Sequence, residues 1–565
     1  MPQSLSIFLN YWPKNNYILP QFGSHRRDYV RQLLAVLYCL IALSSVSVQA
    51  NEQTQFDQET QALMQQLVTV KLSKTLPVLE QLVAQGGAEM LPLFQTMLAG
   101  KLYYIKSSKD IVAVEKHNGE YHLSNVFSGE SLGTKSKKEI KKIRVNNKLR
   151  VYLRQSIAGL QIQHPDAEKR LIAVKELYSS LSKDSVATLK SAYTTEQDSD
   201  VKSAMELAFA LFDVNSQDRD TRYAAVKAMT GSLENDARNA LTAVVNNETD
   251  EKIKATAEKA LKKINERIEF YDFVDQLFFG LSLGSVLLLA AIGLAITFGV
   301  MGVINMAHGE MIMLGAYTTY VIQLIMPNHI EYSLFVAVPA AFIVSGLVGI
   351  LIERGVIRFL HGRPLETLLA TFGISLILQQ LVRTVFSPLN RQVESPTWMS
   401  GTLDINPVLS LTLNRLYILA FALLVFGLLL LILRRTSLGL NVRAVSQNRS
   451  MAKAMGIRTD WVDAMTFGLG SGIAGIAGVA LSQLTNVGPN LGQAYIIDSF
   501  MVVVFGGVGN LWGTLVAAFS LGVANKFLEP VTGSVLASIL VLVFIILFIQ
   551  KKPKGLFPQK GRAAE

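Results

Sequence analysis

The chain has 565 residues, of which 50% are hydrophobic and 17% are charged, and its formal net charge is +10. A single core rarely grows beyond about 250–300 residues, so this length predicts at least two domains. Residues 277–565 hold only 18 of the 53 Lys and Arg and 11 of the 43 Asp and Glu. This second half is too apolar for a soluble protein, which excludes a purely cytosolic or nucleic-acid-binding protein despite the positive charge.

Residues 1–50 have the pattern of a secretory signal peptide. Basic residues at 26–31 precede an apolar run at 33–43, and small residues then lead to a predicted cleavage site after Ala50. An uncleaved anchor helix is the alternative, although the apolar run is short for a membrane span. Residues 1–25 fit neither a signal nor a domain, which predicts a start codon assigned too early. Cys39 is the only cysteine, so we expect no intramolecular disulfide and no multi-thiolate metal site.

Residues 51–150 are predicted to form an exported α+β segment. Apolar residues at helical spacing over 57–98 indicate short amphipathic helices, and residues 102–114 and 121–126 indicate strands of a small β-hairpin region. Residues 129–136 nearly spell a phosphate-binding loop but are one residue short, and a hairpin turn is favoured. The sequence therefore predicts no nucleotide site, no metal site and no cofactor.

Residues 151–269 are predicted to be a soluble helical domain that contains a duplication. Residues 170–175 align without gaps on residues 222–227, and the alignment extends over 166–268. Each copy has three amphipathic stretches, which resemble HEAT-type helical repeats. Two interpretations remain open here: a docking surface for another protein, or a capping domain without a separate partner.

The fold class is mainly α, with a polytopic helical membrane domain of about 8–9 spans at residues 270–557 and a cytoplasmic tail at 558–565. The apolar runs that predict these spans lie at 277–299, 311–326, 333–352, 366–386, 416–433, 462–485, 494–508, 511–528 and 532–549. The run at 494–508 is short and is a candidate re-entrant segment. An exported N-terminal domain and nine crossings place the C-terminus in the cytoplasm. Lys and Arg are concentrated in the predicted inner segments, as the positive-inside rule expects.

Polar residues or glycines interrupt the apolar sequence at three places, namely residues 305–310, 371–379 and 506–510. Ionisable groups inside a membrane are costly and are often functional, and helix breaks are tolerated against protein or a water-filled path. The alternatives are that Glu310 only caps its helix and that the glycines only allow the helices to pack closely. The predicted translocation path is lined by Asn305, His308, Glu310, Thr371, Ser375, Gln379, Gly506, Gly507 and Asn510.

Four motifs, in order, make the membrane half resemble bacterial branched-chain amino acid ABC transporter permeases of the LivH type. They are GLAITFGVMGVINMAHGE at 293–310, LATFGIS at 369–375, VVVFGGVGN at 502–510 and KPKGLF at 552–557. The exported extension, including residues 142–150, resembles the urea-transporter subtype of that family. The resemblance implies an inner-membrane permease subunit, most simply for urea, and branched-chain amino acids or short amides are the alternative substrates.

Such permeases imply four kinds of partner: a second permease, cytoplasmic ATPase subunits, a periplasmic substrate-binding protein and membrane lipid. Arg443, Ala452 and Gly456 lie in the long inner loop that corresponds to the ATPase coupling position, although Ser450 and Met451 depart from the usual coupling motif. No catalytic residue is predicted, because His308 and Glu310 lack the further groups that an intramembrane enzyme needs. A membrane-tethered docking protein that acts through its repeat domain is the remaining alternative.

Overall fold

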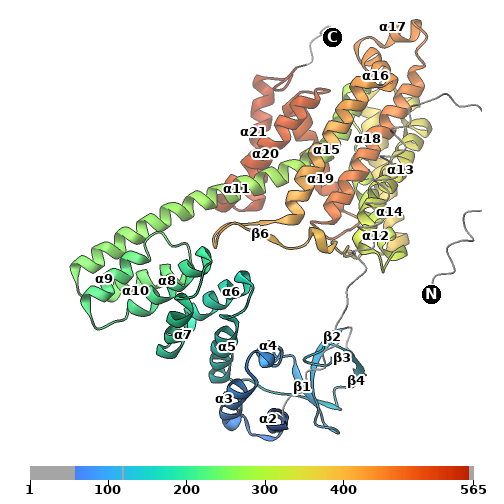
Figure 1. Ribbon diagram of the computed structural model, residues 1–565. Helices are drawn as coiled ribbons and strands as arrows, with labels where there is room; N and C mark the ends of the chain where they lie inside the picture. The colour runs from blue at the N-terminus through green and yellow to red at the C-terminus, as the bar shows by residue number, and fades with distance from the viewer. Residues whose placement is uncertain (1–57, 118–119, 559–565) are drawn as a thin grey trace, which may run out of the picture. The chain divides into compact units, whose positions relative to one another are not determined.

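The computed structural model describes residues 58–117 and 120–558 (Figure 1). These residues form two compact units, which divide between Ser180 and Leu181. The predicted signal peptide, with Cys39 and Ala50, lies outside the described residues, as do residues 559–565 of the predicted tail.

The first unit begins with three short helices that pack on one another. They are α2 (Gln58–Thr69), α3 (Thr75–Gly86) and α4 (Leu91–Leu98), with the 3₁₀ turns η1 (Leu72–Lys74) and η2 (Gly87–Met90) between them. Leu79, Leu82 and Phe94 are fully buried, and their helical spacing is the amphipathic pattern of the sequence. Helices α5 (Asn147–Gln161) and α6 (Ala167–Leu177) and the turn η3 (Tyr178–Ser180) complete the unit.

A five-stranded antiparallel sheet follows these helices. Its strands are β1 (Leu102–Ile105), β2 (Ile111–His117), β3 (Glu120–Ser124), β4 (Ser131–Lys135) and β5 (Ile140–Lys142), in the order β4-β3-β2-β1-β5. The run at 102–114, expected as one strand, is two strands joined by a turn, and Tyr103 of β1 pairs with Val112 of β2. The sheet is therefore larger than the predicted hairpin region. Residues 129–136 cover the end of the β3–β4 turn, β4 and the residue after it.

Helices at the predicted duplication start at equivalent positions in the two copies. Helix α6 corresponds to α9 (Arg219–Ala228), α7 (Lys183–Tyr193) to α10 (Asn235–Asn247), and α8 (Ser199–Asp213) to the start of α11 (Glu251–Met301). Asp198 and Asp250 cap α8 and α11 alike, each accepting two backbone N–H bonds. The assignment of these helices to the HEAT type stays a prediction.

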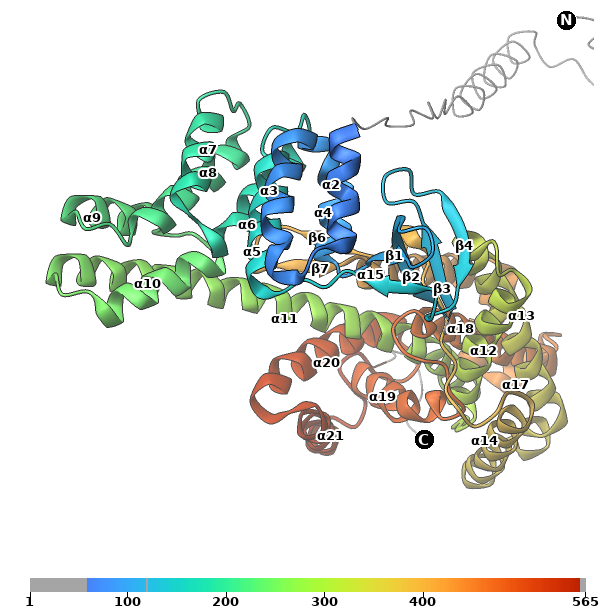
Figure 2. The same ribbon diagram turned by 90° about the horizontal axis from the view of Figure 1, so that it is seen from below.

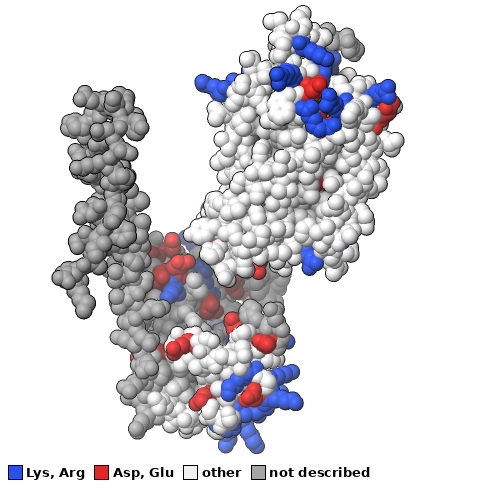
Figure 3. Space-filling model, turned by 90° about the vertical axis from the view of Figure 1, so that its right-hand side faces the viewer, with Lys and Arg blue, Asp and Glu red and all other residues white. Residues whose placement is uncertain are grey.

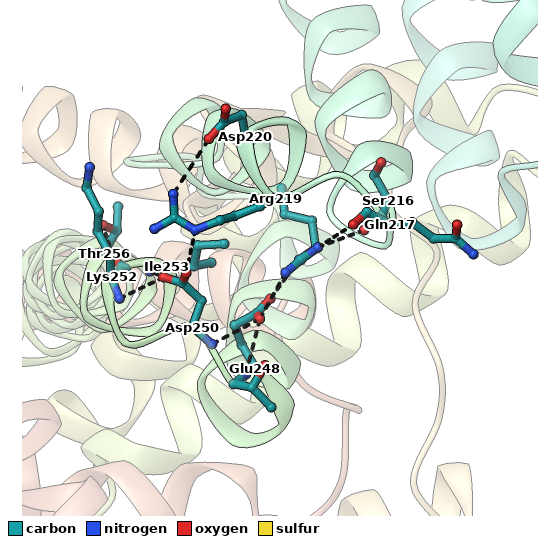
Figure 4. Close-up of polar contacts among 11 residues, drawn as sticks. Ser216, Gln217, Arg219, Asp220, Glu248, Asp250, Lys252, Ile253 and Thr256 are labelled. Carbon is teal, nitrogen blue, oxygen red and sulfur yellow. Dashed lines mark hydrogen bonds and ion pairs between the residues drawn. The ribbon is translucent and has the colours of Figure 1, made fainter.

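Ion pairs join α9 to the end of α10 and the start of α11 in the second copy (Figure 4). Arg222 Nε lies 2.9 Å from Glu248 Oε2, and Arg219 Nε lies 2.5 Å from Asp250 Oδ2. Figures 1 and 2 show α9 and α10 beside the N-terminal end of α11, which they contact. Because α11 is a single helix of 51 residues, the second copy continues without a break into the membrane half.

Each predicted apolar run corresponds to one helix, although the runs at 311–326, 462–485 and 494–508 continue past the ends of their helices and the run at 532–549 begins before its helix. Besides α11 these helices are α12 (His308–Ile325), α13 (Ile330–Gly355), α14 (Pro364–Phe386), α15 (Leu413–Arg435), α18 (Thr459–Ser482), α19 (Leu491–Gly506), α20 (Leu511–Thr532) and α21 (Ser534–Lys551). By length and hydropathy, seven helices of the described residues are candidate membrane spans, and α12 and α19 are not among them. Seven of the expected eight or nine spans therefore meet this criterion, and α12 and α19 are two further helices of the bundle. Helices α11 and α18 are central, since 83% of the apolar window of each is buried.

The two ends of this helical bundle differ in charge. Figure 3 shows Lys and Arg gathered at the end that carries α16 (Ser437–Gln447) and α17 (Arg449–Ala454), beside a broad uncharged belt. We call this the basic end. The opposite end carries the short hairpin β6 (Thr402–Asp404) and β7 (Ser410–Thr412) and the 3₁₀ turn η5 (Thr397–Met399), and we call it the hairpin end. The turn η4 (Ile357–Leu360) lies between α13 and α14.

Candidate functional site

Helix α12 begins deep inside the bundle. Helix α11 ends at Met301, Gly302 follows with a φ of +67°, and the chain is not helical again until His308. His308 Nε2 lies 2.8 Å from the carbonyl oxygen of Ala290, so the ring donates to the backbone of α11. Ala290 precedes the end of α11 by eleven residues, about 16 Å of helix at the usual rise. Residues 302–307 therefore return into the bundle as non-helical chain, with a turn at 306–307, before α12 starts.

Helix α19 also begins inside the bundle, against the first turn of α12. Residues 483–490 return from the end of α18, and Gly492 is the second residue of α19. A methyl group on Gly309 would lie 2.6 Å from the carbonyl oxygen of Gly492, and a methyl group on Gly492 would collide with Gly309. The two helices therefore touch backbone to backbone, which only glycine permits. No side chain caps either first turn, and the two first turns are brought together in the interior.

Glu310 lies at this junction and is 1% exposed. Its Oε1 accepts hydrogen bonds from Ser375 Oγ at 2.9 Å and from Gln379 Nε2 at 2.7 Å. Ser375 is the middle residue of α14, so the carboxyl group lies near the middle of the bundle. Its Oε2 is buried without a hydrogen-bond partner in the described part of the chain. Buried polar atoms are almost always paired, so this oxygen is a candidate acceptor for a bound solute.

Two further predicted path residues support the chain break that precedes α12. Asn305 Oδ1 accepts from the backbone N–H of Ala307 at 3.0 Å. Thr371 Oγ1 accepts from the backbone N–H of Met306 at 3.1 Å, one turn of α14 before Ser375. The structure thus gathers Asn305, Glu310, Thr371, Ser375 and Gln379 around one point, and we call these five residues the central polar cluster. His308 is fully buried beside them, against α11.

The remaining predicted path residues contact a different segment. Phe557 donates its backbone N–H to the carbonyl oxygen of Gly506 at 3.1 Å and accepts from Asn510 Nδ2 at 3.1 Å. A methyl group on Gly507 would lie 2.6 Å from the carbonyl oxygen of Phe557. Gly506, Gly507 and Asn510 therefore hold the KPKGLF segment at the basic end, and the central polar cluster does not include them. The contact joins two of the sequence motifs.

The predicted coupling residues build the surface of the basic end. Ala452 is 5% exposed and packs against Val442 and Val445, and Gly456 turns the chain after α17 with a φ of +88°. Arg443 donates from Nη1 to the carbonyl oxygen of Leu433. Ala452 is buried, whereas Arg443 and Gly456 are exposed. Sequence reasoning did not single out Met451 and Met455 as contact residues, although they are 59% and 78% exposed. Apolar side chains exposed on a charged surface indicate a contact with another protein, and this is the signal that could have identified the two methionines.

A cavity of about 1210 Å³ opens beside α17 at the basic end. The ion pair of Arg449 Nη1 and Asp463 Oδ1, at 3.2 Å, lies in its wall. His361, which also lines the cavity, has its pKa lowered from the usual value, chiefly by burial and then by the charge of Arg449. The ends of α11, α13 and α19 and the start of α18 meet in this wall.

Known proteins match the membrane half of the chain. Residues 276–549 match the family of permease components of branched-chain amino acid transport systems. The high-affinity branched-chain amino acid permease protein BraD of Pseudomonas aeruginosa is 30% identical over 299 residues, which are 51% of this chain and 96% of that protein. LivH of Salmonella typhimurium is 31% identical over the same shares. The ribose import permease RbsC of Escherichia coli is 27% identical over 39% of this chain and 68% of its own.

No solved structure matches the chain significantly. The match to BraD and LivH covers nearly the whole length of those permeases, and residues before 276 lie outside the family match. The chain therefore belongs to the family of ABC-type branched-chain amino acid transport permeases, as a membrane subunit that carries an additional N-terminal region.

Proposed function

We propose that this protein is the permease subunit of an ABC importer whose substrate is urea, and that the solute passes the central polar cluster. The observation that carries the proposal is the carboxyl group of Glu310 at mid-bundle. Its Oε1 accepts hydrogen bonds from Ser375 and Gln379, and its Oε2 is buried without a partner in the described part of the chain. Urea has four N–H donors and one carbonyl acceptor, so a buried carboxylate oxygen beside hydroxyl and amide groups suits it.

The absence of a buried cation in the described part of the chain supports a neutral solute. No Lys or Arg there is buried, and the buried charged side chains are Glu196, Glu310, Glu353 and Asp463. The carboxylate of an amino acid zwitterion would favour a positive partner at similar depth. The exported extension, which resembles the urea subtype, supports the same substrate.

Branched-chain amino acids are the second candidate substrate. The names of BraD and LivH favour them. The structure offers one feature in their favour, because the first turns of α12 and α19 present backbone N–H groups that attract a carboxylate. Short amides would satisfy the same groups as urea.

The family implies a substrate-binding protein and ATPase subunits as partners, and we propose their places. ATPase subunits would contact α17 and the exposed Met451 and Met455 at the basic end, which by the positive-inside rule faces the cytoplasm. Residues 51–269 and the hairpin end would then face the periplasm, after removal of residues 1–50. We propose that the helical repeats dock a periplasmic partner, and a membrane-tethered docking protein without transport is the other class of function.

Uptake measurements in the natural host separate these functions. A strain with this gene deleted should lose high-affinity uptake of ¹⁴C-urea and keep leucine uptake, and the full-length gene should restore it. Glu310→Gln should abolish urea uptake, while Gln323→Glu, near the hairpin end of α12, is the control for a changed charge in the same helix. Loss of leucine uptake instead of urea uptake would refute the urea assignment. A deletion of residues 57–265 that leaves uptake intact would refute the docking class.

A further inference from the structure

The cavity of about 1210 Å³ at the basic end has a wall made mainly of charged and polar side chains. Met301 of α11 and Val504 of α19 line it on the side of the bundle. Ser450 and Lys453 line it on the side of α17. The wall residues, all in the described part of the chain, include no member of the central polar cluster. The cavity is therefore a second polar chamber of the membrane half, and the proposed transport function does not use it.

Glu353 of α13 is a buried acid in this wall. Its side chain is 2% exposed, and its Oε2 has no hydrogen-bond partner in the described part of the chain. Arg354 Nε lies 3.7 Å from that oxygen, which is too far for a hydrogen bond, and its guanidinium carbon lies 5.5 Å from the ring centre of Trp461. A buried carboxylate oxygen without a donor is costly, so Glu353 is a candidate acceptor for a ligand's N–H groups.

Two further acids make the surroundings of Glu353 negative. Asp460 and Asp463, near the start of α18, also line the cavity and act electrostatically on Glu353. Asp463 is neutralised by its bonded Arg449, and Arg358 Nη2 lies 3.9 Å from Asp460 Oδ2. Asp460 is 58% exposed and solvated by water, whereas Glu353 is not. An ammonium group suits Glu353 best, because it donates hydrogen bonds and also neutralises the carboxylate.

Two lysines of the wall supply the opposite charge. Lys453 of α17 and Lys554 of the KPKGLF segment line the cavity, and neither forms an ion pair with a described residue. His361 adds no charge at neutral pH, because burial lowers its pKa. The unpaired groups are thus two ammonium groups and the carboxylate of Glu353. A ligand that balances them carries one ammonium group and two carboxylates, which is the charge pattern of an acidic α-amino acid.

We propose that this cavity binds an acidic α-amino acid, with the ammonium group on Glu353 and the carboxylates on Lys453 and Lys554. The bound molecule would connect α13 with α17 and with the KPKGLF segment, and so restrain α17 relative to the bundle. Because α17 is the proposed contact of the ATPase subunits, binding should slow transport from the side that the basic end faces. The binding step is independent of the transported solute, whereas this regulatory step rests on the proposed function.

Calorimetry on the full chain in lipid nanodiscs tests the binding step. The probes are L-glutamate, L-glutamine, which lacks the second carboxylate, and glutarate, which lacks the ammonium group. L-glutamate should bind, and the other two should bind at least about tenfold more weakly, since each loses a charged contact. Glu353→Gln and Lys453→Gln should each weaken L-glutamate binding by a similar factor. Lys551→Gln is the matched control, because Lys551 is exposed at the end of α21 and does not line the cavity.

Uptake into proteoliposomes that hold the assembled transporter tests the regulatory step. L-glutamate on the side of the basic end, together with ATP, should slow uptake of whichever solute is transported several-fold. The ratio of the rates with and without L-glutamate should return close to one in Glu353→Gln. Absence of L-glutamate binding, equal binding of the three probes, or binding that neither cavity variant weakens overturns the site. Binding that leaves uptake unchanged supports the site and overturns its regulatory role, whether or not the solute is urea.

Discussion

Gly507 provides a quantitative test of the contact between α19 and the KPKGLF segment. Its φ of +103° is a conformation that side-chain-bearing residues rarely adopt, and an added methyl group would lie 2.6 Å from the carbonyl oxygen of Phe557. Gly533 is the matched control, with a φ of +82° and nothing within 4 Å of an added methyl group. Gly507→Ala and Gly533→Ala therefore share the backbone strain and differ in the collision with the tail.

The difference between the two variants can be estimated from the bonds that the collision breaks. Backbone strain costs about 1–3 kcal/mol at either position. At Gly507 the tail must also move, which removes the bonds from Leu556 N–H to Phe505 O at 2.9 Å and from Phe557 N–H to Gly506 O at 3.1 Å. Each bond contributes about 0.5–1.5 kcal/mol, so their loss favours the detached tail by about 2 kcal/mol, or roughly 30-fold.

Hydrogen exchange followed by mass spectrometry on the detergent-purified protein measures this population directly. The amides of Leu556 and Phe557 should exchange roughly 30-fold faster in Gly507→Ala than in the unmodified chain, since exchange follows the detached fraction. In Gly533→Ala they should keep the unmodified rate, while the melting temperature falls in both variants. Equal exchange rates at these two amides in the two variants would refute the conclusion that Gly507 holds the KPKGLF segment in place.

Three further predictions concern other parts of the chain. Hydrogen bonds from Arg219 lower the pKa of Asp250 to about 2, and Arg222 similarly lowers the pKa of Glu248. Depressed carboxyl pKa values stabilise the folded state above the unfolded pKa values near 4, so the melting temperature should fall as the pH drops from about 4.5 to about 2. Asp250→Asn with Glu248→Gln should flatten that dependence, measured by circular dichroism. Phe94→Ala should cost about 3–5 kcal/mol in denaturant unfolding because Phe94 is fully buried, and an equal loss from Leu132→Ala, which is 50% exposed, would contradict this. Met455→Ser should leave the melting temperature unchanged but abolish uptake, since Met455 is 78% exposed, and unchanged uptake would remove it from the ATPase contact.

Local patterns predicted the members of the central polar cluster but not their contacts with one another. Ser375 and Gln379 are four residues apart, so they share a face of α14, and both contact Glu310. Glu310 itself is recognisable because it is a charge within a long apolar sequence. Helix periodicity was thus enough to group Ser375 with Gln379, whereas their contact with Glu310, 65 and 69 positions away, depends on tertiary packing. The role of these side chains in transport stays a proposal.

The contact of Asn510 with Phe557 could not be predicted in the same way. These residues are 47 positions apart and belong to no common helix, so no local period connects them. The sequence shows only that the glycines at 506 and 507 break a helix. Tertiary packing decides whether such a break lines a solute path or contacts another segment of the chain.

The inner starts of α12 and α19 connect the sequence pattern with the proposed mechanism. A search for long apolar windows passes over both helices, because α19 has only 16 residues and α12, with 18 residues like α21, contains polar residues such as His308 and Glu310. Both helices begin inside the bundle, where Gly309 and Gly492 allow the two first turns to touch. A continuous span has no free N–H groups in the membrane interior, so it offers a solute nothing but side chains. Two helices that start there add backbone donors beside the carboxyl group of Glu310. The weakest membrane signals in this sequence thus mark the point where a polar solute is best accommodated.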